Sequence, residues 1–106
     1  MVLELSGELD LAEAPRLAGE IEWATGGERA SLVLDLEALE FLDSAGLRAI
    51  LAAYESARTR GEGFAVTPGT PQIRRLLTIA GVNGHLPTID SADAALPDGR
   101  EGLQTS

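Results

Sequence analysis

One segment of the chain, Ser31–Leu36, is nearly continuous in apolar residues. A strand with one face in water alternates apolar and polar residues, whereas a strand buried on both faces does not. Such a strand needs a covering layer on each side, which α/β domains with parallel sheets provide. The segment therefore predicts the central strand of a mostly parallel sheet backed by helices.

The flanking segments alternate between strand and helix patterns. Short strands are predicted at residues 2–5, 64–66 and 87–89. Helices are predicted at 13–24, 44–60 and 71–80, where apolar residues recur at intervals of three and four. Residues 37–42 are predicted to be a connection. The order predicts a single small α/β domain with a sheet of four to five mostly parallel strands.

The domain is predicted to end before the C-terminus of the chain. Residues 91–96 are expected to form one or two helical turns that complete a domain spanning residues 1–96. From Pro97 onward the sequence is mainly polar, so residues 97–106 are predicted to be a flexible tail.

The charge of the chain is distributed unevenly. Residues 1–43 hold eleven acidic side chains and two arginines, whereas residues 44–106 are balanced. An acidic half repels phosphates, so nucleic acids and anionic membranes are not expected as partners. A protein with a basic face fits better, although surplus acid can also serve only solubility.

Several other classes are disfavoured by composition. The chain has no cysteine and one histidine, so neither a disulfide framework nor a metal site with familiar ligand spacing is expected. No cofactor is predicted. No apolar run approaches the length of a membrane span, and the N-terminus lacks a secretory pattern. A cytoplasmic location is the resulting expectation.

A second stretch contains the candidate functional residues. An apolar run ends at Asp43-Ser44-Ala45-Gly46, and a helical pattern begins there. Backbone N–H groups at a helix start favour an anion. Ser44 is therefore a candidate helix cap, nucleophile or phosphate acceptor. Spacing alone leaves Asp10 and Asp43 open to a purely structural role, as turn or helix-entry residues.

Catalysis by Ser44 is disfavoured. The only candidate base is the loop residue His85, and the residues around Ser44 do not form a Gly-x-Ser-x-Gly elbow. The glycines at 26–27 and at 61 and 63 are not followed by the Lys-Ser/Thr of a phosphate-binding loop, so they are predicted to end helices. An enzyme is not expected.

Four ordered motifs resemble those of a known family. They are Gly7-Glu8-Leu9-Asp10, the strand Leu32–Leu36, Phe41-Leu42-Asp43-Ser44-Ala45-Gly46-Leu47, and the run from Thr67 through Leu77 to Ala80-Gly81-Val82. Together, over about residues 1–90, they resemble the STAS domain, and more narrowly the bacterial anti-sigma factor antagonists. The family's domains carry a strand before the one leading into Gly7–Asp10, so a first strand is expected to be missing here.

The resemblance implies specific roles. Ser44 corresponds to the serine that an anti-sigma factor serine/threonine kinase phosphorylates. The implied docking surface for this partner consists of Asp10, Asp43, Ser44, Ala45, Gly46 and Leu47. The unphosphorylated antagonist binds the anti-sigma factor and frees sigma, phosphorylation releases it, and a phosphoserine phosphatase resets it. The alternative is a STAS subunit of a lipid-transport ATPase complex or stressosome without phosphorylation. A monomer or weak dimer is expected.

Overall fold

The fold is described from a computed structural model, which describes residues 1–25, 31–82, 85–89 and 100–105. The strands are β1 (Val2–Leu9), β2 (Leu32–Leu42), β3 (Phe64–Val66) and β4 (Arg100–Thr105). The helices are the 3-10 turn η1 (Ala14–Arg16), α1 (Leu17–Thr25), α2 (Ser44–Thr59) and α3 (Pro71–Ile79).

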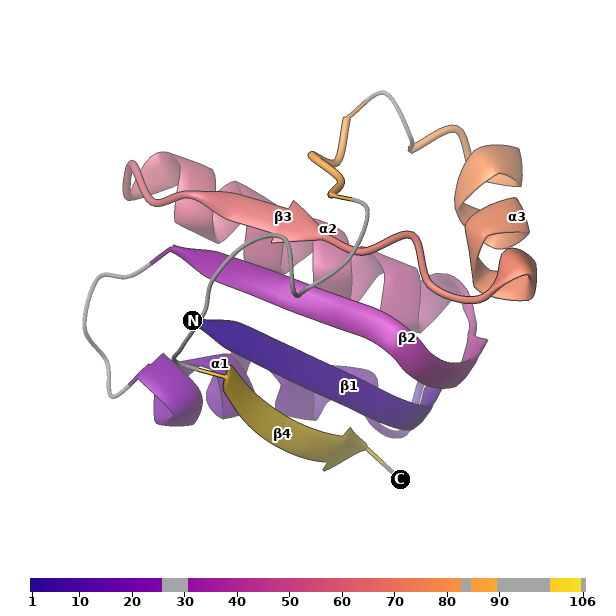
Figure 1. Ribbon diagram of the computed structural model, residues 1–106, viewed down its shortest axis with the longest axis horizontal. Coiled ribbons are helices and arrows are strands. Elements are labelled where there is room, and N and C mark those ends of the chain that lie inside the picture. Colours follow the sequence, from indigo (N-terminus) through magenta and orange to yellow (C-terminus); the bar gives the residue numbers. More distant parts are fainter. Residues whose placement is uncertain (26–30, 83–84, 90–99, 106) are drawn as a thin grey trace.

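The strands form one four-stranded sheet in the order β3-β2-β1-β4, and every neighbouring pair is parallel. This confirms the predicted α/β class. Parallel neighbours require crossover connections, and α1 and α2 supply two of them behind the sheet (Figure 1). Because the strands run in the same direction, their carboxyl ends meet at one edge of the sheet, on the right in Figure 1.

Aliphatic side chains fill the core between the sheet and its helices. Leu34, Leu36 and Ile50 are completely buried there. On the other face of the sheet, Val33 belongs to a second, smaller cluster with Val2. Every residue of 32–36 is buried. The predicted central strand, buried on both faces, is therefore confirmed from Leu32 onward, whereas Ser31 is exposed and precedes β2.

One polar pair lies within this buried region. Thr67 Oγ1 accepts a hydrogen bond from the Leu36 backbone N–H at 2.8 Å and contacts Asp35 Oδ1 at 3.4 Å. The same carboxylate oxygen accepts a bond from the Glu37 N–H at 3.0 Å. Buried polar groups are tolerated when they are hydrogen-bonded. Through these hydrogen bonds, Thr67, which directly follows β3, is connected to the middle of β2.

The prediction that residues 37–42 form a connection is wrong, because β2 continues through them to Leu42. The register with β1 shifts between Glu4 and Ser6 and again between Gly7 and Glu8. Such bulges insert extra residues into one strand and break its alternation. Buried leucines consequently recur every third residue here, at positions 36, 39 and 42. Because a regular strand has a period of two, this spacing does not indicate a strand in the sequence. β1 likewise extends beyond the predicted 2–5.

The predicted helices are present, with local differences. The first begins as η1 and becomes α1 only at Leu17, so the helix predicted from Glu13 starts later. In α3, Thr70 caps the helix and Pro71 is its first residue, so this helix begins where it was predicted to begin. Not all of the apolar residues that recur in these helices are buried, since Ala18 and Ala80 are exposed and Leu76 is 38% exposed.

The C-terminal prediction is corrected by β4. Residues 100–105 were expected in a flexible tail, but they pair in parallel with β1 over six residues. The predicted strand at 87–89 is a single bridge from Val66 to Thr88. The predicted helical turns at 91–96 lie outside the described residues. Within the described chain, no helix has the length and apolarity needed to cross a membrane.

Candidate functional site

The site lies at the carboxyl edge of the sheet, where the chain leaves β1 and β2. Leu9 and Leu42 are register partners at the ends of these strands. The residues that follow them, Asp10 and Asp43, are therefore brought to the same part of the edge. Carboxyl ends of parallel strands are the usual position of sites in open α/β sheets. Two acids 33 positions apart thus become neighbouring parts of one surface.

Asp43 joins two elements through its carboxylate. Its Oδ1 accepts a hydrogen bond from the Gly46 N–H at 2.8 Å and caps α2. Its Oδ2 accepts a bond from the Leu11 N–H at 3.0 Å, across to the segment that follows β1. The structural role that spacing left open for Asp43 is therefore real. This half-buried carboxylate ties the loop 10–13 to the start of α2.

We expect Asp43→Ala to lower the free energy of unfolding by about 2 kcal/mol, because both the helix cap and the loop contact are lost. Asp43→Asn is expected to lose about half as much, since its amide oxygen still caps α2 while its NH2 group cannot accept from Leu11. Urea unfolding followed by circular dichroism measures both variants. Asp43→Ala with the wild-type midpoint would contradict this assignment.

Asp10 organises the turn after β1. Its Oδ1 accepts hydrogen bonds from the N–H groups of Ala12 and Glu13, each at 3.1 Å. Its backbone carbonyl accepts from Ala14 at 2.7 Å. Asp and Asn side chains commonly close turns in this way. Asp10 is half-buried, so it shapes the loop and also contributes to the surface.

Ser44 is exposed and is the first residue of α2. The possibility that it caps the helix is wrong, because Asp43 provides the cap. Among the described residues, no hydrogen bond joins the Ser44 hydroxyl to His85, the base that a serine nucleophile would require here. The hydroxyl stands at a helix N-terminus, where an added anion is favoured electrostatically.

The other three predicted docking residues differ in accessibility. Ala45 is half-buried, and Leu47 is half-buried and packs against the core. Gly46 is buried, so it does not line an accessible surface. A Cβ added to it would lie 2.0 Å from the Leu9 carbonyl oxygen. The glycine lets α2 approach the end of β1, which is why the site is compact.

One residue of the site was not predicted from the sequence. Leu11 is 73% exposed, although its backbone is bound to Asp43. In the sequence, the signal that could have identified Leu11 is its position directly after Asp10, outside both the predicted strand and the predicted helix. Nothing in its spacing distinguishes it from a leucine that packs inward, so its exposure required the tertiary structure.

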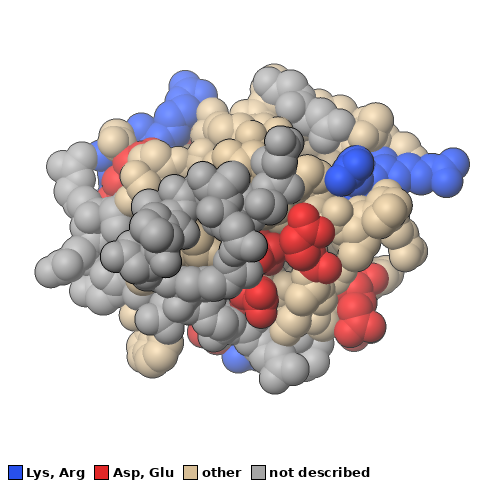
Figure 2. Space-filling model, in the orientation of Figure 1, with Lys and Arg blue, Asp and Glu red and all other residues tan. Residues whose placement is uncertain are grey.

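Acidic side chains predominate around the site, and the exposed cation Arg48 lies one helical turn after Ser44. Near the loop, Arg16 pairs with Glu13 at 2.6 Å and with Glu20 at 3.0 Å. Hydrogen bonding to Glu13 and then Glu20 raises the pKa of Arg16, so this cation stays charged and is already neutralised by neighbours. On the face in Figure 2, several acidic side chains lie in the middle and toward the side where the strands end, and cationic side chains project above them on that side. Exposed glutamates 8, 37 and 40 belong to the carboxyl-terminal halves of β1 and β2.

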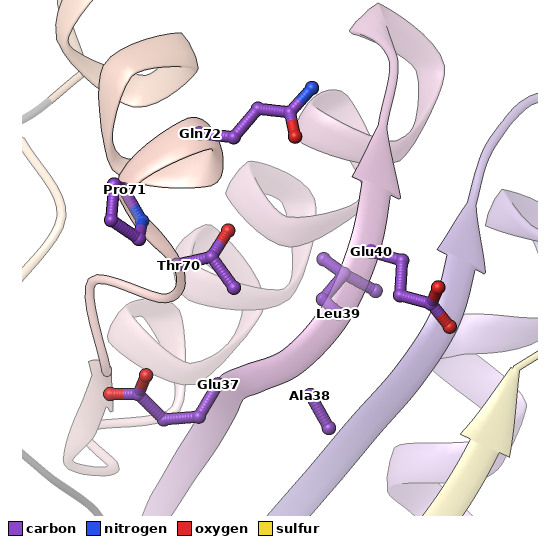
Figure 3. A pocket seen from close by; sticks show the side chains of 7 residues that line it. All are labelled: Glu37, Ala38, Leu39, Glu40, Thr70, Pro71 and Gln72. Carbon is purple, nitrogen blue, oxygen red and sulfur yellow. The ribbon is translucent and has the colours of Figure 1, made fainter.

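A groove of about 500 Å³ lies between β2 and the start of α3. Glu37, Ala38, Leu39 and Glu40 line one side, and Thr70, Pro71 and Gln72 line the other (Figure 3). Its lining holds neither a histidine nor a serine nucleophile. In the described part of the chain, no group of three or more potential ligands is placed to hold a metal ion. The functional groups that this edge presents to solvent include the exposed Ser44 hydroxyl and the carboxylates of Asp10 and Asp43.

Residues 1–89 match the family model described as "Mlab, STAS domain". The anti-sigma F factor antagonist of Paenibacillus polymyxa is 31% identical over 99 residues, which cover 92% of this chain and 85% of that protein.

Two solved structures are similar. An anti-sigma factor antagonist from Mycobacterium paratuberculosis is 34% identical with a TM-score of 0.67, over 85% of this chain and 76% of that one. The anti-sigma factor antagonist SpoIIAA in its unphosphorylated form has a TM-score of 0.63 at 19% identity, over 87% and 81% of the two chains, and supports the fold alone. The match to the family model over residues 1–89 establishes that this chain belongs to the STAS domain family.

Proposed function

We propose that this protein is an anti-sigma factor antagonist whose binding is switched by phosphorylation of Ser44. The observation that carries the proposal is the position of Ser44, exposed at the first residue of α2 and next to the capping carboxylate of Asp43. The antagonist names of the relatives in Paenibacillus polymyxa and Mycobacterium paratuberculosis support it.

In the proposed cycle, the unphosphorylated protein binds an anti-sigma factor that is also a serine kinase, and sigma is freed. The partner contacts the exposed parts of Asp10, Asp43, Ser44 and Ala45, with Leu47 at the margin. Transfer of the ATP γ-phosphoryl group to the Ser44 hydroxyl releases the complex. A phosphoserine phosphatase restores the hydroxyl by hydrolysis.

The fold itself tolerates the modification. A phosphoserine carries a charge of roughly −1.5 to −2 near neutral pH. The N-terminal dipole of α2 and its free N–H groups favour that charge, while the adjacent Asp43 opposes it. Because the Ser44 side chain is exposed, the phosphate remains in water and no core contact is broken. The switch therefore acts on the partner and leaves the domain folded.

Incubation with candidate anti-sigma factor kinases and ATP, followed by intact-mass measurement, tests the proposal. Wild type is expected to gain the mass of one phosphoryl group and Ser44→Ala to gain none. Ser56→Ala, an exposed serine later in α2, serves as the matched control and should be phosphorylated like wild type.

The outcome distinguishes the proposal from its alternative. If no kinase modifies Ser44 and none binds the protein, a STAS subunit that acts in another assembly without phosphorylation becomes the better assignment.

A further inference from the structure

We propose that Leu11 is the apolar anchor of the docking surface, and that it inserts into an apolar pocket bordered by cationic side chains on the anti-sigma factor kinase. The inference rests on the proposed function, because it names a further contact of the same partner. Leu11 is one of few large apolar side chains exposed in the described chain, at 73% of its surface.

Leu11 is held in place by its surroundings. Its N–H donates to Asp43 Oδ2 at 3.0 Å, and the two following N–H groups donate to Asp10 Oδ1. The turn then leads directly into η1, whose Arg16 pairs with Glu13. Because these contacts fix the backbone of the loop, that backbone loses little conformational freedom on binding. Preorganisation of this kind favours affinity.

The carboxylates that hold Leu11 also indicate the partner's chemistry. Asp10 and Asp43 flank the leucine, and each accepts its described hydrogen bonds from backbone N–H groups and not from a cationic side chain. A partner that covers Leu11 must also approach these two negative charges, which are costly to desolvate unpaired. An apolar pocket with Arg or Lys at its rim satisfies both requirements. A second copy that docked through the same site would bring its own Asp10 and Asp43 against these carboxylates, and like charges repel.

The same contact explains why Ser44 is within reach of a kinase. Asp43 connects Leu11 on one side with the α2 cap on the other, so a partner seated on Leu11 lies beside the start of α2. A leucine side chain takes no part in phosphoryl transfer, so Leu11 acts as a positioning residue.

The experiment uses the full chain and the kinase that phosphorylates Ser44. We expect Leu11→Ala to weaken the Kd about tenfold or more and to raise KM for phosphorylation with kcat nearly unchanged. Leu11→Met should recover most of the affinity. Trp23→Ala is the matched control, because Trp23 is 76% exposed near the end of α1, away from the carboxyl edge, and should bind like wild type.

Three results would overturn the inference. One is a Leu11→Ala variant that binds the kinase as wild type does. Another is a dimer, detected by sedimentation, that Leu11→Ala dissociates, since Leu11 would then contact a second copy. A wild-type protein that binds no kinase overturns the proposed function and this inference with it, whereas the first two results leave the proposed function standing.

Discussion

Gly46→Ala is expected to lose about 3 kcal/mol or more of unfolding free energy, a large part of the stability of a domain this size. The added Cβ would lie 2.0 Å from the Leu9 carbonyl oxygen and 2.9 Å from Leu42 Cδ1. The nearest atom belongs to the backbone of a central strand, so no side-chain rotation relieves the clash. To accept the methyl group, α2 must move away from β1, and the Asp43 contacts are disturbed with it.

Urea unfolding followed by circular dichroism measures this effect, with Gly19→Ala as the control. Gly19 is exposed in α1 and a Cβ there meets no atom within 4 Å. Alanine is favoured over glycine inside a helix, so Gly19→Ala should stabilise by about 0.5–1 kcal/mol. If Gly46→Ala unfolds at the wild-type urea concentration, the close approach of α2 to β1 is not as described.

Phosphorylation of Ser44 is expected to weaken binding of the anti-sigma factor kinase at least roughly 100-fold, because the partner must cover a dianion next to Asp43. Ser44→Asp should weaken it in the same direction, and Ser44→Ala should bind close to wild type. The melting temperature of the phosphoprotein should change by only a few degrees, since an exposed charge at a helix N-terminus alters stability by about 1 kcal/mol or less.

Titration calorimetry with phosphoprotein of verified mass measures the change in Kd. Ser56→Asp is the matched control, because it adds the same charge to an exposed position farther along α2 and should leave Kd within about twofold. A Ser44→Asp protein that binds as tightly as wild type, together with tight binding of the phosphoprotein, would contradict a charge-based switch.

Local signals predicted much of this fold because they act over a few residues. The apolar run at 31–36 identified the central strand, which begins at Leu32, and the apolar residues that recur over 71–80 identified α3. Local sequence patterns were insufficient where pairing with another strand changes the spacing of the buried residues. Residues 37–42 have a three-residue leucine spacing that arises from bulges against β1, and bulges depend on the partner strand. β4 likewise owes its conformation to pairing with β1, because its own sequence is mainly polar.

The sequence by itself determined the class of fold and the identity of the exposed hydroxyl, since periodicity and the Asp-Ser-Ala-Gly motif are local properties. Only the tertiary structure decided how the site is built. Parallel pairing of β1 with β2 brings Asp10 and Asp43 to one edge, and a buried Gly46 allows α2 to close against that edge. The tertiary structure also decided that the Leu11 side chain is exposed while its backbone N–H is held by a carboxylate 32 residues away. Contacts across that separation depend on how distant elements pack, and no short stretch of sequence encodes them.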